Sequence, residues 1–228
     1  MSLAPLEPIR GLDEQDLATA RGFLYLGLGG TLFWLLLLGA VRLPYWDAQR
    51  LPTYILGSLL QLRGVHALGQ THPRVSQALA APRRRLLWAL LGQCYLAPFM
   101  AAWWRLPEAA YFLAHAVALL SLGIWTLFLV AQAARHWARC LGDRAFELES
   151  GLTAACVILL QAIPCYLGLA WAVWATARNG SNLYLEILFW FERAPGPLLS
   201  LLLLPIPFLL IIAWKARLLA LRPHPLAP

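Results

Sequence analysis

The sequence predicts an all-α protein, a polytopic bundle of transmembrane helices. Of its 228 residues, 61% are hydrophobic and 13% are charged, and the mean hydropathy is +0.64. Long apolar runs recur along the chain, each with about the 20 residues that a helix needs to cross a bilayer. The alternating segments of about ten residues that form barrel strands do not occur. Helices are therefore the structure expected to satisfy the backbone where water is absent.

Five of these runs are clear, and they span residues 22–41, 86–104, 109–132, 152–176 and 197–214. The first follows a segment that holds Glu7, Asp13, Glu14 and Asp16, so it is interpreted as a retained span and not as a cleaved signal peptide. Residues 51–69 form a weaker run that contains Arg63 and His66. We expect this segment to cross as a sixth span; a chain of five spans and a re-entrant segment are the alternatives.

The basic residues predict the orientation. With six spans, twelve of the 18 Lys and Arg residues lie inside and five lie outside, with Arg63 in the membrane. With five spans the numbers become thirteen and five, so this rule does not choose between the two. The C-terminus is cytoplasmic in both. The pairs Tyr45–Trp46 and Trp103–Trp104 would join an outer aromatic belt if six helices cross, and this favours six.

The chain is predicted to form one integral membrane domain over residues 1–228. Residues 1–21 form a lead that ends in an interfacial helix, with Asp13 as its N-cap and acidic residues in its first turn. Residues 22–214 form the transmembrane bundle. Residues 215–228 are expected to be a disordered cytoplasmic tail, because Pro223, Pro225 and Pro228 oppose a helix there.

Several function classes lack their motifs in this sequence. Neither a Gly-x-Ser-x-Gly elbow nor a His-Glu-x-x-His pair is present, and the one lysine, Lys215, follows Trp214 and not a glycine, as a phosphate-binding loop would require. The four cysteines form no Cys-x-x-Cys pair and are interpreted as packing residues. The net charge of +7 is typical of the positive-inside rule, so nucleic acid is not an expected partner. No cofactor and no catalytic residue are predicted.

Arg63, His66 and Gln70 form the sharpest polar constellation. Their spacing of three and four places them on one stripe of the helix predicted over residues 51–69. Ionisable residues within a span are costly and often mark a substrate pathway. The alternative is that Arg63 lies near the inner interface and extends its charged end to the headgroups.

His115 is the second candidate for the substrate pathway. It lies near the outer third of its span, beside the small residues Ala110, Ala114 and Ala118, which would let another helix approach. We expect a hydrogen-bonded histidine between helices. A haem is the weaker alternative, since His66 and His136 do not lie at the depth of His115.

His136, Cys140, Asp143 and Glu147 would form a stripe of metal-ligand types on an unbroken helix. Gly142 followed by Asp143 instead predicts a helix end and a new N-cap. Arg139 and Asp143 are also spaced as an ordinary ion pair. No metal site is therefore predicted, and His136, Cys140 and Asp143 remain weak metal candidates.

Residues 182–193 are apolar but too short to cross a membrane, and they precede the last span on its outer side. We expect this segment to lie in the interface. Two interpretations stay open: an amphipathic lid, or part of an outer gate with Glu186, Glu192 and Arg193 as polar contacts.

The order of these parts resembles the membrane subunit of exporter-class, type-two ABC transporters. The matching pieces are the entry helix at residues 12–21, the six spans, the basic segment 70–85 and the outer segment 182–193. The resemblance implies that residues 70–85 include a short coupling helix, that Arg83, Arg84 and Arg85 dock on a separate ATPase subunit, and that a second permease copy completes the export path. It also implies a place in the bacterial cytoplasmic (inner) membrane.

Two other classes of function remain open. The first is a non-catalytic anchoring or assembly subunit that packs against larger partners through the row of Ala110, Ala114 and Ala118. The second is an intramembrane redox protein or enzyme that uses His66, His115 or the group around His136.

Overall fold

The structure is a computed structural model that describes residues 14–42, 51–71, 73–106, 110–180 and 203–221, together with six residues between 182 and 189. All regular structure within these ranges is helical, and this confirms the predicted all-α class. Asp13, Tyr45, Trp46, Glu192, Arg193 and the residues after Leu221 lie outside the described residues, and so do the predictions made for them.

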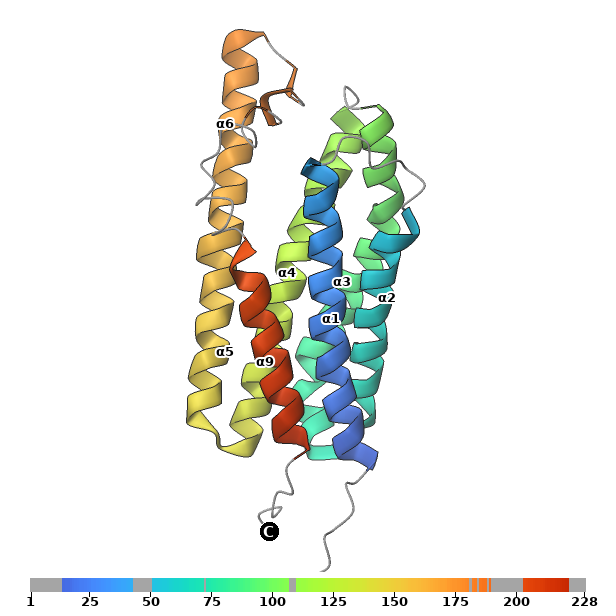
Figure 1. The fold of residues 1–228 in the computed structure, drawn as a ribbon, viewed down its shortest axis with the longest axis vertical. Helices are drawn as coiled ribbons and strands as arrows, with labels where there is room; N and C mark the ends of the chain where they lie inside the picture. The colour runs from blue at the N-terminus through green and yellow to red at the C-terminus, as the bar shows by residue number, and fades with distance from the viewer. Residues whose placement is uncertain are drawn as a thin grey trace, which may run out of the picture.

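Within the described residues, six rods form the bundle. They are α1 (Glu14–Arg42), α2 (Leu51–Ala67) with a 3-10 turn (Leu68–Gln70), α3 (Pro73–Arg105), α4 (Ala110–Leu141), one rod made of α5 (Arg144–Cys156), a π-helical segment (Val157–Ala162) and α6 (Ile163–Asn179), and α9 (Pro205–Ala220). Consecutive rods run in opposite directions along the long axis (Figure 1). The beginning of α1 and the end of α9 lie at the same end, at the bottom of Figure 1, here called the basal end.

Glycines bring the backbones of α1 and α2 into contact. A Cβ atom at Gly29 would lie 2.7 Å from the carbonyl oxygen of Gly57, and one at Gly64 would lie 2.8 Å from that of Gly22. The glycines are seven residues apart on each helix. This separation is just under two turns, so the two glycines of each helix lie on the same face. The antiparallel pair therefore has a fixed register, with Gly22 opposite Gly64 and Gly29 opposite Gly57.

Besides α2, helix α1 contacts α4 and α9, through further small residues. A Cβ at Gly27 would lie 2.6 Å from the Cβ of Ala213 on α9, and one at Gly30 would lie 3.5 Å from Leu127 on α4 and from Leu209 on α9. Phe23 and Leu26 have no exposed surface and lie in the same core cluster. The inward faces of α1 therefore form part of the core.

Several helices extend beyond the predicted apolar runs, among them α3, α4 and α9. The first, α3, begins at Pro73 and not at residue 86, and the second, α4, continues to Leu141. The third, α9, continues to Ala220, so the prediction of a disordered tail is wrong for residues 215–220. The physical reason is that an apolar run marks the part of a helix that suits hydrocarbon, whereas Lys-Ala-Arg-Leu-Leu-Ala is composed of good helix formers and continues the helix.

The predicted span over residues 152–176 contains a π-helical segment that the apolar pattern does not reveal. Val157–Ala162 forms it, and Pro164 follows in the first turn of α6. Because proline has no N–H group and its ring displaces the preceding turn, the regular hydrogen-bond ladder is interrupted there. The π-helical turn lets α5 and α6 continue as one rod.

Two helices of the described chain, Tyr111–Leu141 and Arg144–Asn179, are long and apolar enough to cross a membrane.

Gly29→Ala is expected to lower the free energy of unfolding by about 2 kcal/mol, because its methyl group would meet backbone atoms of α2 that cannot move independently. Gly92→Ala is the matched control. Its Cβ would lie 2.8 Å from Leu122 Cδ1, the flexible end of a side chain. Thermal and denaturant unfolding of both variants in detergent would measure the difference. Equal stability of the two variants would contradict the backbone contact.

Candidate functional site

A polar groove of about 750 Å³ lies between the first turns of α1 and the last turns of α2, at the basal end. Among the described residues, its walls come from these two helices and from the 3-10 turn that follows α2. The lining residues are Glu14, Gln15, Leu17, Ala18, Arg21, Tyr25, Arg63, His66, Ala67 and Gln70.

The groove brings together the stripe that the sequence predicts, although Arg63 and His66 lie on α2 and Gln70 lies on the 3-10 turn after it. Arg63, His66 and Gln70 all line it and all are exposed. The Gln70 amide nitrogen lies 3.4 Å from His66 Nε2. The Arg63 guanidinium carbon lies 5.6 Å from the centre of the Tyr25 ring on α1, within the range of a cation–π contact. Their common face is as predicted; their role as substrate contacts stays a prediction.

The opposite wall of the groove comes from α1 and is not predicted from the sequence. Glu14, Arg21 and Tyr25 line it. Neither Arg21 nor Arg63 forms an ion pair with any residue in the described part of the chain. Among the lining residues Glu14 is the one acid. The groove therefore carries an excess of positive charge, and an anion is the ligand that would balance it.

A buried polar network joins α2, α3 and α4 inside the bundle. The Ser58 hydroxyl donates to Gln93 Oε1 at 3.2 Å, and Gln93 Nε2 donates to the Thr126 hydroxyl at 2.8 Å and to the Leu122 carbonyl at 3.1 Å. Gln93 is 1% exposed. Sequence reasoning missed this network, although a single glutamine inside an apolar run, Gln93, was the available signal.

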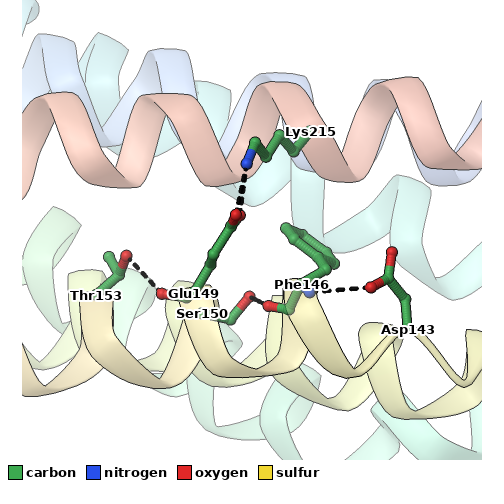
Figure 2. Close-up of polar contacts among 6 residues, drawn as sticks. All are labelled: Asp143, Phe146, Glu149, Ser150, Thr153 and Lys215. Atoms are coloured by element: carbon green, nitrogen blue, oxygen red, sulfur yellow. Dashed lines mark hydrogen bonds and ion pairs between the residues drawn. The ribbon is translucent and has the colours of Figure 1, made fainter.

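The connection between α4 and α5 breaks the helix as predicted. Gly142 has a φ of 70°, and the Asp143 carboxylate accepts a hydrogen bond from the Phe146 backbone N–H at 3.0 Å (Figure 2). Asp143 is therefore an N-cap. Arg139 pairs with Glu147 at 2.6 Å and not with Asp143, and Arg135 lies 3.5 Å from the same carboxylate.

This break separates the members of the metal-ligand stripe. His136 Nδ1 lies 2.8 Å from the Gln132 carbonyl oxygen of its own helix, and Glu147 is engaged by two arginines. The described residues contain no group of three or more His, Cys, Asp or Glu side chains placed to hold a metal ion.

An ion pair fastens α9 to α5 near the basal end. Lys215 Nζ lies 2.7 Å and 2.6 Å from the two carboxylate oxygens of Glu149 (Figure 2). On α5, the hydroxyl of Ser150 donates to the carbonyl of Phe146 and that of Thr153 donates to the carbonyl of Glu149. Both hydroxyls are thus satisfied within α5. Lys215 is thus a link between helices at the end of α9.

His115 lies between α3 and α4 at the far end from the groove. Its ring stacks on Phe99 of α3 with centroids 4.4 Å apart, and Nδ1 lies 2.7 Å from the Tyr111 carbonyl oxygen. The hydrogen bond is within its own helix, and the contact with the neighbouring helix is aromatic stacking. Of the alanine row, Ala118 packs against the core and Ala114 is exposed, while the side chain of Ala110 is outside the described residues.

The basic segment does not form a separate coupling helix, because residues 73–85 are the first turns of the continuous α3. Arg84 and Arg85 are exposed, and Arg83 is half-buried. A Cβ at Gly69 would clash with the Arg83 guanidinium, so Arg83 covers the 3-10 turn after α2. Of the three arginines predicted to dock on a partner, Arg84 and Arg85 are therefore exposed on the surface, whereas Arg83 is partly covered.

In the outer segment, Glu186 is 7% exposed, and its backbone N–H donates to the Asn182 carbonyl at 3.1 Å. The structure does not bring this residue into the groove.

Comparison with known protein families, with curated proteins and with solved structures gives no match to this chain.

Glu147 carries a lowered pKa that predicts a pH-dependent contact. The hydrogen bond from Arg139 holds the pKa of this carboxyl below its usual value, and the charges of Arg139 and Arg135 act in the same direction. A carboxyl whose pKa is lower in the folded state stabilises the fold above its unfolded-state pKa. That contribution is lost as the pH falls through the folded-state pKa.

Glu147→Gln is therefore expected to lower the unfolding temperature at neutral pH and to leave it unchanged in acid below the folded-state pKa of Glu147. Thermal unfolding of the wild type and the variant across this pH range measures the effect. The double variant Arg139→Gln, Glu147→Gln controls for the loss of the pair itself. A deficit of equal size at both pH values would contradict the assignment.

Proposed function

We propose that this chain is a multi-pass integral membrane protein of the bacterial cytoplasmic membrane, with six spans and with the basal end in the cytoplasm. The observation that carries the proposal is the exposure of large apolar side chains. They cover the outer faces of the rods: Trp88 and Leu148 are each 69% exposed and Leu167 is 64% exposed. The buried interior is mostly apolar as well, and Ser58, Gln61, Gln93 and Thr126 are polar residues buried within it. Such a surface suits lipid and not water.

The charge distribution supports the orientation. Exposed cations at the basal end include Arg84, Arg85, Arg139 and Arg144, and Arg178 lies at the opposite end of α6. Cytoplasmic segments carry the excess of arginine and lysine in bacterial membrane proteins. The beginning of α1 and the end of α9 lie at the same end of the bundle (Figure 1), which agrees with an even number of spans.

Within this placement, the chain acts as the membrane subunit of a transport system, in the manner of an exporter-class ABC permease that works with a separate ATPase chain and a second permease copy. Two features at the cytoplasmic end support this function. The groove exposes Arg63, His66 and Gln70, and the first turns of α3 present Arg84 and Arg85 for a partner. In this proposal, the start of α3 replaces a separate coupling helix.

A non-catalytic anchoring subunit is the second candidate. The observation that favours it is the shallow packing of the α5–α6 rod, whose most apolar 18-residue window is 22% buried, against 44% for α4. An apolar rod with so little cover from the described residues offers a wide surface to another membrane subunit.

Cysteine labelling of intact cells tests the topology. In a variant whose four cysteines are replaced by serine, we expect Arg178→Cys to react with a membrane-impermeant maleimide and Arg144→Cys to react only after permeabilisation. Glu14→Cys distinguishes the span number: six spans protect it, and five spans expose it. Labelling of Arg144→Cys from outside would contradict the orientation.

Gentle extraction of the tagged protein tests the transport function. We expect a nucleotide-binding ATPase chain to copurify, and its recovery to fall by about tenfold when Arg84 and Arg85 are both replaced by Glu, because charge reversal opposes docking. Arg178→Glu, at the opposite end, is the control and should not change the recovery. A stable complex without an ATPase would contradict transport and support the anchoring subunit.

A further inference from the structure

We infer that the groove between α1 and α2 binds the phosphate of an anionic phospholipid, with the acyl chains along the apolar outer strip of the same two helices. The inference rests on the proposed membrane placement. It does not depend on transport, because the site is formed by two helices of one chain.

The register of the helix pair places the ligand groups at one level. Each of the four contact glycines follows a residue that is exposed: Arg21 precedes Gly22, Leu28 precedes Gly29, Leu56 precedes Gly57 and Arg63 precedes Gly64. A helix turns by about 100° per residue, so each preceding residue points sideways from the contact. Because Gly22 is opposite Gly64, Arg21 and Arg63 belong to the same end of the strip. Leu28 and Leu56 belong to the other.

The outer strip therefore changes from polar to apolar along the helices, as an amphiphile does. Its basal part is the groove. Beyond Tyr25 it consists of leucines, of which Leu28, Leu35, Leu56 and Leu59 are between 45% and 57% exposed. A phospholipid whose headgroup lies against the arginines has its acyl chains at the level of these leucines.

The charges of the groove fit a single phosphodiester. Two guanidinium groups and one carboxylate, from Arg21, Arg63 and Glu14, leave an excess of one positive charge among the charged lining residues, with histidine taken as neutral. A phosphodiester carries one negative charge. Guanidinium donors match phosphate oxygens in pairs, and Arg63 is held in place over the Tyr25 ring.

Native mass spectrometry of the full chain in detergent micelles tests the site. The probes are dioleoylphosphatidylglycerol, which is anionic, and dioleoylphosphatidylcholine, which is zwitterionic. We expect one phosphatidylglycerol molecule to bind about tenfold more tightly than phosphatidylcholine. Arg63→Gln is expected to weaken the binding of phosphatidylglycerol about tenfold, because a charge-assisted hydrogen bond is lost.

Arg178→Gln is the matched control, because Arg178 is also an exposed arginine over an aromatic ring, 5.2 Å from the centre of Trp174, but outside the groove. Its affinity should equal that of the wild type. Circular dichroism and thermal unfolding establish that each variant is folded, and Arg63→Lys, which keeps the charge, is expected to retain more affinity than Arg63→Gln.

Three results would overturn the inference. The first is equal lipid affinity of Arg63→Gln and Arg178→Gln. The second is displacement of phosphatidylglycerol by millimolar inorganic phosphate, which would assign the site to a free anion. The third is equal binding of phosphatidylglycerol and phosphatidylcholine. If the protein still requires detergent, this result contradicts the lipid site and leaves the membrane placement standing. A chain that remains soluble without detergent would instead overturn the placement and the lipid site together.

Discussion

The backbone contact between α1 and α2 is the constraint on which the rest of the structure depends. Where glycine opposes glycine, the two helices approach until a Cβ would lie less than 3 Å from a carbonyl oxygen. In the proposed membrane placement, helices would gain little from burying apolar surface, so close approach and the dispersion contacts it permits would hold them together. Other faces of α1 carry Gly27 against α9 and Gly30 against α4 and α9. The small residues of α1 therefore set its distances to α2, α4 and α9.

Hydrogen bonds in the interior complement this packing. Gln93 accepts from Ser58 and donates to Thr126 and Leu122, so one side chain joins three helices. A buried amide without partners would cost more than an apolar residue, and the network removes most of that cost. Gln61 differs, because its Oε1 is buried and has no partner among the described residues. It lies on the α2 face beside Gly29, where the backbones are closest. The polar interior is thus well satisfied between α2, α3 and α4 and less so against α1.

The sequence predicts the helical class and the local signals well, and the relations between helices poorly. Gly142 and Asp143 encode a stop and a start that need only neighbouring residues, and the stripe of Arg63, His66 and Gln70 follows from helical period alone. Helix ends were wrong where apolarity was used as their marker, as at Pro73 and Ala220, because helix propensity continues where hydropathy falls. The π-helical turn before Pro164 depends on how the chain relaxes around a missing N–H. Glu14 and Arg21 join the groove only through the register of α1 on α2, which no local pattern contains.

That register nevertheless has a trace in the sequence, which is visible once the contact is known. Arg-Gly and Leu-Gly occur in this order on α1, and Leu-Gly and Arg-Gly occur in the reverse order on α2, with the same spacing of seven. Antiparallel pairing of such helices places like against like, arginine with arginine and leucine with leucine. Two arginines at one level repel each other, and solvent or an anion between them weakens that repulsion. The apolar continuation of the same strip makes a headgroup, and not water alone, the group that best offsets that repulsion. The glycines that bring the helices together are therefore also what defines a site for an anion.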